Sequence, residues 1–173
     1  LINNPSENFI TNNTKIDVLG EIQNEPHLKN VYVNGNLASL SGNYFTFQNL
    51  PLQEGNVQIV VEAYDLLDHK GTKEVPGIAD FAAPNVEILA NGAPFEDEKY
   101  FNIPVSITIN LTDNLTDPSA VIKINGNLYE QNTPLSNDGL YLIEVIATDS
   151  AGNSKTYNKK FTIDTKPPVI SNI

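Results

Sequence analysis

The sequence contains one five-residue pattern twice, VNGNL at residues 33–37 and INGNL at residues 124–128. An Asn-Gly pair between alternating apolar residues is the strongest short-range signal for a β-hairpin, because a type I′ turn needs positive φ at both central positions and these residues tolerate it best. The residues before each pair, 31–33 and 122–124, have apolar side chains at alternate positions. Each copy therefore predicts a strand, a tight turn and a second strand.

The duplication extends beyond these turns. AYDLLDHKGT begins at Ala63 and the similar ATDSAGNSKT at Ala147, a separation of 147 − 63 = 84 residues. Asp80 in IADFAAPNVEI and Asp164 in IDTKPPVISNI are equally far apart, since 164 − 80 = 84. A fixed internal period indicates repeated copies of one folding unit. The expected domains are residues 1–80 and 81–166, followed by residues 167–173 as the start of a further domain or a linker.

Hydrophobic periodicity predicts an all-β fold. Apolar residues alternate with polar ones through residues 57–63 and 105–111, and no segment shows a sustained 3.6-residue apolar period. Two-residue alternation indicates strands with one buried face, and turn-forming Asn, Asp and Gly residues recur between them. A unit of about 84 residues suits seven strands in two sheets. The predicted architecture is two tandem immunoglobulin-like β-sandwiches.

One tyrosine supports the sandwich prediction. Tyr141 follows Asp138 and Gly139 and begins an apolar stripe. This is where a tyrosine corner forms, with the hydroxyl bonded to the backbone a few residues upstream. The alternative is a half-buried strand tyrosine without that bond. The first unit has Val57 at the corresponding position and cannot form the same corner.

Composition excludes several classes of partner and chemistry. The chain has 10 Lys, no Arg and 21 acidic residues, a net charge of −11, so repulsion disfavours nucleic acid and anionic membranes. The absence of Cys removes disulfides, thiolate catalysis and the usual zinc sites. No apolar stretch approaches the ~20 residues of a membrane helix, so we expect no membrane insertion. Without an initiating Met or signal peptide, the chain is expected to be a piece of a longer protein.

Two stretches resemble known bacterial domains. Residues 138–168, DGLYLIEVIATDSAGNSKTYNKKFTIDTKPP, resemble the C-terminal half of bacterial Ig-like domains, with their Gly-x-Tyr, Ala-x-Asp-x-Ala-Gly-Asn and Ile-Asp-x-x-x-Pro motifs. In the first unit, TNNTKIDVLGEI, VYVNGNLASL and YFTFQNLPLQEGNVQIVVEAYD resemble the glucodextranase domain-B-like variety. This unit has Leu67, Asp68 and His69 where Ala, Gly and Asn are usual, so its last turn is expected to differ. The resemblance implies a large secreted or surface-displayed bacterial protein.

The sequence offers no catalytic constellation, and no enzyme is expected. His27 and His69 lie in different predicted loops, and neither stands in a motif with a nucleophilic Ser. A catalytic triad needs a nucleophile, a base and an orienting group within hydrogen-bond reach. The acidic run at residues 96–98 is typical of a solvated loop.

Three functions remain after catalysis is set aside. The first is a non-catalytic spacer whose partners are neighbouring domains of the same chain, positioning a catalytic or adhesive domain. Pro84, Pro167 and Pro168 favour stiff junctions for that role. The second is an adhesive module whose loops recognise a host protein or a glycan, with Tyr32 and Tyr44 as candidate sugar-stacking residues. The third is an accessory domain of an extracellular hydrolase, such as a cell-envelope subtilisin-like serine protease.

Calcium is the one cofactor that the sequence suggests. In an Ig-like sandwich the entering linker and two of the loops lie at one end, and hard cations take six to eight oxygen ligands there. The predicted ligands are carboxylates of the linker and loops at the domain junction: Asp80, Asp113, Asp117, Asp149 and Glu54. The alternative is structural. Asp149 then accepts backbone N–H bonds from the turn at residues 150–153, and Asp80 caps the linker.

Overall fold

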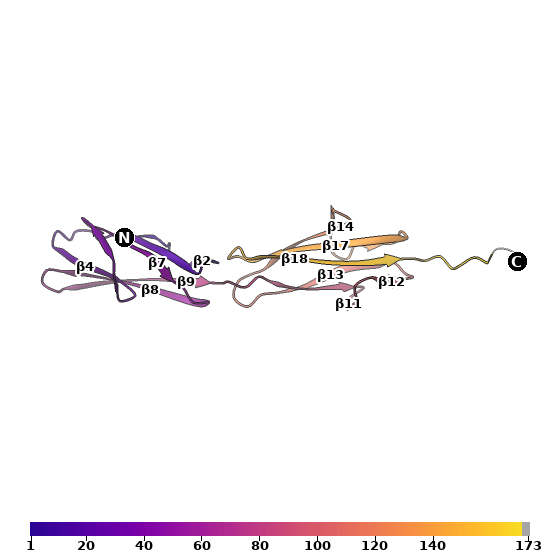
Figure 1. Cartoon of the computed structure of the whole chain (residues 1–173), viewed down its shortest axis with the longest axis horizontal. Helices are drawn as coiled ribbons and strands as arrows, with labels where there is room; N and C mark the ends of the chain where they lie inside the picture. Colours follow the sequence, from indigo (N-terminus) through magenta and orange to yellow (C-terminus); the bar gives the residue numbers. More distant parts are fainter. Residues whose placement is uncertain (171–173) are drawn as a thin grey trace. The chain divides into compact units, whose positions relative to one another are not determined.

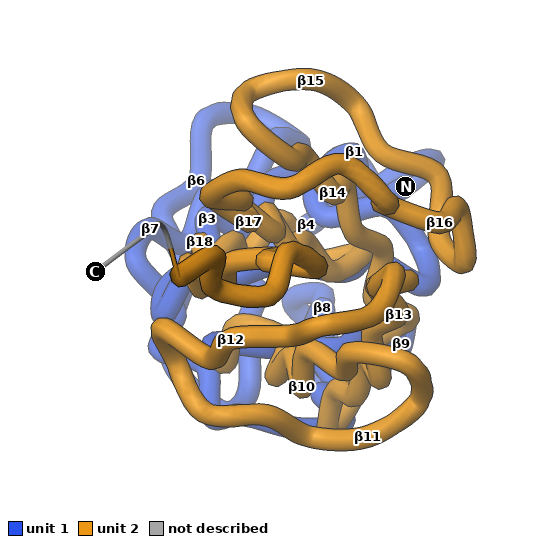
Figure 2. Tube along the Cα trace, turned by 90° about the vertical axis from the view of Figure 1, so that its right-hand side faces the viewer, with its two compact units in different colours: residues 1–81 blue, residues 82–173 orange. Residues whose placement is uncertain are grey.

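The computed structural model describes residues 1–170, and residues 171–173 lie outside the described part. The chain divides into two compact units, Leu1–Phe81 (unit 1) and 82–173 (unit 2), coloured separately in Figure 2. The expected further domain at residues 167–173 thus falls partly outside the described residues. Within residues 1–170, no helix is long and apolar enough to cross a membrane.

Unit 1 contains two β-sheets (Figure 1). Its strands are β1 (Ile2–Asn4), β2 (Phe9–Thr11), β3 (Lys15–Glu21), β4 (Leu28–Val33), β5 (Asn36–Leu37), β6 (Ser39–Ser41), β7 (Tyr44–Pro51), β8 (Gly55–Asp65) and β9 (Lys70–Ala79). One sheet has the order β1-β3-β7-β6 and the other β2-β9-β8-β4-β5. All pairs are antiparallel except β2 with β9, which are parallel.

Unit 2 likewise contains one four-stranded and one five-stranded sheet. Its strands are β10 (Asn85–Ala90), β11 (Ala93–Pro94), β12 (Lys99–Phe101), β13 (Val105–Thr112), β14 (Ser119–Ile124), β15 (Asn127–Leu128), β16 (Pro134–Leu135), β17 (Gly139–Thr148) and β18 (Ser154–Ile163). The sheets have the orders β11-β10-β13-β16 and β12-β18-β17-β14-β15. Here β12 pairs in parallel with the last strand, β18, as β2 does with β9. Both units are immunoglobulin-like β-sandwiches, as predicted.

The alternating residues of both sheets form one core in each unit. In unit 1, Val18 and Phe45 of one sheet pack with Ile59 and Val75 of the other. The core of unit 2 is built in the same way around Phe161, which has no exposed surface. Burial of one strand face by the opposite sheet is what the two-residue period requires.

The repeated Asn-Gly pairs are the hairpin turns that the sequence predicts. Asn125 has φ 51° and Gly126 φ 79°, and the turn joins β14 to β15. Asn125 also contacts β17, the strand beside β14 in the sheet. Its N–H donates to the Leu142 carbonyl (2.9 Å) and its Oδ1 accepts the Leu142 N–H (2.8 Å). The same pair of bonds links Asn34 to Val60 in unit 1. The pattern recurs because this Asn both adopts positive φ and holds the neighbouring strand.

A substitution at Gly126 tests the turn. Gly126→Ala is expected to lower the free energy of unfolding of unit 2 by about 1 kcal/mol or more, because a Cβ is disfavoured at positive φ. No atom lies within 4 Å of the added Cβ, so the cost is one of backbone conformation rather than a clash. Urea denaturation of the two proteins measures the difference, and equal midpoints would contradict the hairpin.

The tyrosine corner is also present. The Tyr141 hydroxyl donates a hydrogen bond to the Asn137 carbonyl (2.8 Å), four residues upstream. The ring stacks on Phe161 with a centroid distance of 5.0 Å and an interplanar angle of 10°. The corner therefore ties the loop before β17 to the centre of the core.

Close packing of a ring on the backbone makes a second glycine critical. An added Cβ at Gly77, in β9, would lie 2.3 Å from the ring of Phe9, a buried residue of the paired strand β2. We expect Gly77→Ala to destabilise unit 1 by about 1–3 kcal/mol through overpacking. Gly71→Ala on the same strand meets no atom within 4 Å and is expected to change stability by no more than about 0.5 kcal/mol. Thermal unfolding of the two variants checks this, and equal effects would contradict the packing.

Candidate functional site

The predicted metal ligands of unit 2 lie in loops at one end of its sandwich. Asp113 follows β13, and Asp149 begins the turn between β17 and β18. Strand register brings the loops together, because β14 joins both: it begins after the Asp113 loop, and its first residue pairs with Thr148. Asp113 and Asp149 each offer a carboxylate oxygen, and these oxygens lie within 4.8 Å of each other.

Asp149 closes the turn that it begins. Its Oδ1 accepts the Asn153 N–H and its Oδ2 accepts the Asn153 side-chain amide, both at 2.8 Å. The Asp149 N–H in turn donates to the Asn153 carbonyl (3.1 Å). Both oxygens of this buried carboxylate therefore have donors within the turn. Asp149 thus makes the turn bonds that the structural alternative expects.

Asp113 has a similar local role. Its Oδ1 accepts the backbone N–H groups of Leu115 and Thr116, both at 3.1 Å. An Asp that bonds to the backbone two and three residues later stabilises a turn through its side chain. The two carboxylates near each other in unit 2 thus carry four hydrogen bonds that organise loops.

Of the other three predicted ligands, Asp117 belongs to unit 2, and Glu54 and Asp80 belong to unit 1. The Asp117 side chain is exposed, and its backbone carbonyl accepts a hydrogen bond from Ser150 Oγ (3.0 Å). Glu54 lies exposed in unit 1, directly before β8. Asp80 also belongs to unit 1, where it is fully buried and its N–H donates to the Thr11 carbonyl (2.9 Å). Binding of calcium by these five residues remains a prediction.

Unit 1 builds the same turn as unit 2 with different residues. Asp65 Oδ1 accepts the N–H groups of Leu67 (2.8 Å) and His69 (2.9 Å), while Oδ2 lies 2.8 Å from His69 Nδ1. Asp68 has φ 64° where Gly152 has φ 93°. The expectation of a differently shaped turn is therefore wrong. The His69 imidazole takes the position of the Asn153 amide, because either group places a nitrogen beside the carboxylate.

This turn also explains the pairing of His69 with Asp65. Burial acts to raise the pKa of Asp65, but the hydrogen bonds from His69 and Leu67 outweigh it and hold the pKa below its ordinary value. His69 itself is largely exposed, with 77% of its side chain accessible. The contacts of Asp65 with Leu67 and His69 lie within the turn. Its role is to close the turn.

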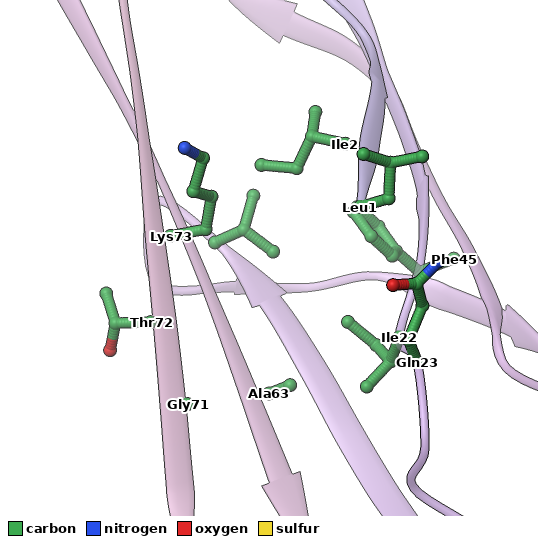
Figure 3. A pocket seen from close by; sticks show the side chains of 10 residues that line it. Leu1, Ile2, Ile22, Gln23, Phe45, Ala63, Gly71, Thr72 and Lys73 are labelled. Carbon is green, nitrogen blue, oxygen red and sulfur yellow. The ribbon is translucent and has the colours of Figure 1, made fainter.

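A pocket of about 210 Å³ opens between the sheets of unit 1 (Figure 3). Its walls are mainly apolar, with Ile2, Ile22 and Phe45 on one side and Thr72 and Lys73 on the facing strand. Small-molecule sites usually measure about 300–1,000 Å³ and contain several convergent polar groups. Lys73 is already paired with Glu7. The pocket does not suggest a reaction.

The two tyrosines considered for sugar stacking do not form one platform. Tyr44 is exposed on β7 of the four-stranded sheet, whereas Tyr32 lies on β4 of the other sheet. Tyr32 packs edge-on against Tyr64, with ring centroids 5.7 Å apart and an interplanar angle of 89°. A flat sugar face needs rings that share one surface, and these two do not.

Comparisons with known proteins agree with the fold. Residues 98–165, within unit 2, match a family model described as a bacterial Ig-like domain. No curated protein matches the chain.

Three solved structures show more distant likenesses. Fibronectin(III)-like modules of Clostridium thermocellum CbhA are 14% identical with a TM-score of 0.44, covering 100% of this chain and 98% of theirs. Dimeric latent PorU from Porphyromonas gingivalis is 12% identical (TM-score 0.35; 96% of this chain, 20% of that one). Bacteroides ovatus SGBP-B, solved with a mixed-linkage heptasaccharide, is 11% identical (TM-score 0.32; 94% of this chain, 67% of that one). All three TM-scores lie below 0.5, and the fold assignment rests on strand topology and the family match.

Proposed function

We propose that the chain is a pair of non-catalytic spacer modules in a multidomain bacterial protein outside the cell. The observation that carries this proposal is where the chain enters and leaves each sandwich. In unit 2 it enters at Asn85, which pairs with Thr112 beside the Asp113 loop, and leaves after Ile163, which pairs with Gly139 at the other end. The last strand, β18, runs the length of the unit (Figure 1). At about 3.3 Å per residue, ten residues separate entry from exit by roughly 30 Å.

Unit 1 has the same property. The Leu1 amino group donates to the Glu21 carbonyl at one end of β3 (2.5 Å). The exit residue, Ala79, pairs with Gly55 and with Thr11, which lie at the other end. A module with entry and exit at opposite ends adds its strand length to the reach of the chain. This geometry suits a spacer that holds a catalytic domain, such as a surface hydrolase, or an adhesive domain at a distance.

Adhesion is the second candidate, favoured by apolar residues exposed at strand ends. Leu66 and Leu67 project from the turn after β8 in unit 1, with 64% and 78% of their surface exposed. Exposed apolar groups in loops can mark a binding site. In this alternative the ligand is a host protein or a glycan.

A module swap distinguishes the two candidates. In the protein that carries these residues, residues 1–166 are replaced by two unrelated β-sandwiches with strands of equal length. A spacer predicts that the neighbouring domains keep their activity after the swap and lose it when the segment is deleted. Loss of activity in the swapped protein would contradict the spacer and support specific binding.

Calcium would add stiffness to such a spacer, and its binding is tested by thermal unfolding. If the five predicted ligands, Asp80, Asp113, Asp117, Asp149 and Glu54, bind calcium, millimolar calcium is expected to raise the unfolding temperature relative to EDTA. Ligand at 100 times its dissociation constant stabilises the folded state by about 2.7 kcal/mol. Asp149→Asn should reduce the shift. No shift in the wild type, or the same shift in the variant, would end the calcium prediction.

A further inference from the structure

Three residues after the last strand are held firmly to unit 2. The Asp164 N–H donates to the Phe101 carbonyl (2.9 Å). The Thr165 N–H and hydroxyl both donate to Asp138 Oδ1, at 2.9 and 2.8 Å. The Lys166 ammonium lies 3.2 Å from Asp138 Oδ2. We call the contacts of Asp138 with Thr165 and Lys166 the exit clasp.

Asp138 is well placed and charged for this role. It immediately precedes Gly139, whose pairing with Ile163 brings the carboxylate beside the departing chain. Hydrogen bonds from the Thr165 backbone and side chain, and then Lys166, hold the pKa of Asp138 below its ordinary value. The carboxylate therefore accepts bonds as an anion, and charge-assisted bonds are stronger than neutral ones. The clasp fixes the direction in which the chain leaves unit 2.

Three exposed apolar side chains lie on β12, in the loop after β12 and on β17, and these two strands flank the end of β18. Tyr100 on β12 and Leu140 on β17 both pair with Thr162 of β18, so the three form one row across the sheet. Tyr100 is 71% exposed and Leu140 56% exposed. Ile103, in the loop after β12, is 53% exposed. We call Tyr100, Ile103 and Leu140 the apolar rim. Figure 2 looks onto the end of unit 2 that carries β12.

The chain itself indicates what covers the rim. Pro168 and Ile170 stand 84 residues after Pro84 and Val86, since 168 − 84 = 84 and 170 − 86 = 84, and β10 of unit 2 begins at Asn85. By this period a further first strand begins at residue 169, three positions after Lys166. Val169 and Ile170, both apolar, are 88% and 90% exposed in the described part of the chain. A second copy of the whole chain is a poorer partner, because both copies carry a charge of −11.

We propose that the exit end of unit 2 is a docking surface for a third Ig-like unit that begins at Val169. The exit clasp aims the chain, and the apolar rim packs against the near end of that unit. Three residues span at most about 10 Å, so a sandwich that starts at residue 169 lies within reach of the rim. This inference rests on the proposed spacer role, because the lengths of consecutive modules add up only when the joint between them is stiff.

The test extends the chain by a second copy of residues 85–166 placed directly after Pro168. Residual dipolar couplings report whether unit 2 and the added unit share one orientation in solution. We expect one alignment tensor for both in the extended protein. The double variant Tyr100→Ser/Leu140→Ser, or Asp138→Ala, should give two different tensors, while Tyr44→Ser in unit 1 should leave them unchanged. Independent tensors in the unmodified extended protein, or no change in either variant, would overturn the proposal.

The clasp can also be measured in the chain as it stands. Amide hydrogen exchange of Thr165 should accelerate by about tenfold or more in Asp138→Ala, because local opening sets the exchange rate. Asp138→Asn keeps an acceptor oxygen and should give a smaller increase. An unchanged exchange rate of the Thr165 amide in Asp138→Ala would contradict the clasp. These experiments read orientation and local order, whereas the module swap reads the activity of neighbouring domains, so either proposal can fail without the other.

Discussion

Replacing Phe161 by Ala is expected to lower the free energy of unfolding of unit 2 by about 3–5 kcal/mol, the usual range for truncating a buried Phe. Phe161 has no exposed surface. It stacks on Tyr141 and meets the rings of Phe95 and Phe101 edge-on, with centroids 6.1 and 5.6 Å away. The substitution therefore leaves a cavity at the point where four aromatic rings converge. It also removes the surface on which the tyrosine corner rests.

Calorimetry of the whole chain measures this effect. Phe45→Ala is the matched control, because Phe45 is also buried, with 2% exposed, but belongs to the core of unit 1. We expect Phe161→Ala to lower the transition that reports unit 2, and Phe45→Ala to lower the other. A loss below about 1 kcal/mol for Phe161→Ala would mean that the aromatic cluster is not the centre of the core.

The sequence predicts most of the fold because its signals are local. An Asn-Gly pair needs only its own backbone and two flanking strands to form a turn, so the hairpins at Asn34 and Asn125 are found correctly. A third pair, Asn91 with Gly92, forms the same turn between β10 and β11. Its Oδ1 accepts the Ser106 N–H (2.8 Å) just as Asn125 accepts Leu142. Asn91 and Gly92 are followed by Ala93 and Pro94 rather than by Asn and Leu. A search for the repeated five-residue pattern therefore does not find this turn.

Residue identity is a weaker guide where different side chains do one job. Leu67, Asp68 and His69 share little with the Ala-Gly-Asn of unit 2, yet the turn is preserved. An imidazole nitrogen replaces an amide nitrogen as the partner of the Asp, and Asp68 adopts positive φ as Gly152 does. A comparison of residue types misses this exchange. A search for any side chain that places a nitrogen beside the carboxylate would identify His69 as the equivalent of Asn153.

The candidate site shows a second limit of sequence reasoning. Topology correctly brings the loops of Asp113 and Asp149 to one end of unit 2, since strand order decides which loops are neighbours. The partners of each carboxylate depend on the path of the loop backbone, which the sequence does not fix. Asp117 lies in the same loop as Asp113, but its side chain is exposed. A count of acidic residues therefore overestimates the number of oxygens that converge.

Removing the carboxylate of Asp149 is expected to destabilise unit 2 by about 2–4 kcal/mol even in EDTA. Asp149 is buried and accepts two hydrogen bonds from Asn153. Bonds to charged groups contribute about 1.5–3 kcal/mol each, and the donors left behind lose their partner. Asp149→Ala should cost more than Asn153→Ala, because the latter removes only the side-chain bond. Asp117→Ala should stay within about 0.5 kcal/mol, since that carboxylate is exposed.

The same variants separate the turn from the metal. If Asp149 acts in both, urea denaturation in EDTA shows the cost of the broken turn, and added calcium stabilises Asn153→Ala but not Asp149→Ala. A double-mutant cycle between Asp149 and Asn153 should give a coupling of roughly 1 kcal/mol, because the two side chains bond directly. A loss below about 0.5 kcal/mol for Asp149→Ala in EDTA would contradict the turn. In that case the hydrogen bonds of the turn would not account for the burial of the Asp149 carboxylate, and a bound cation would be the better explanation for it.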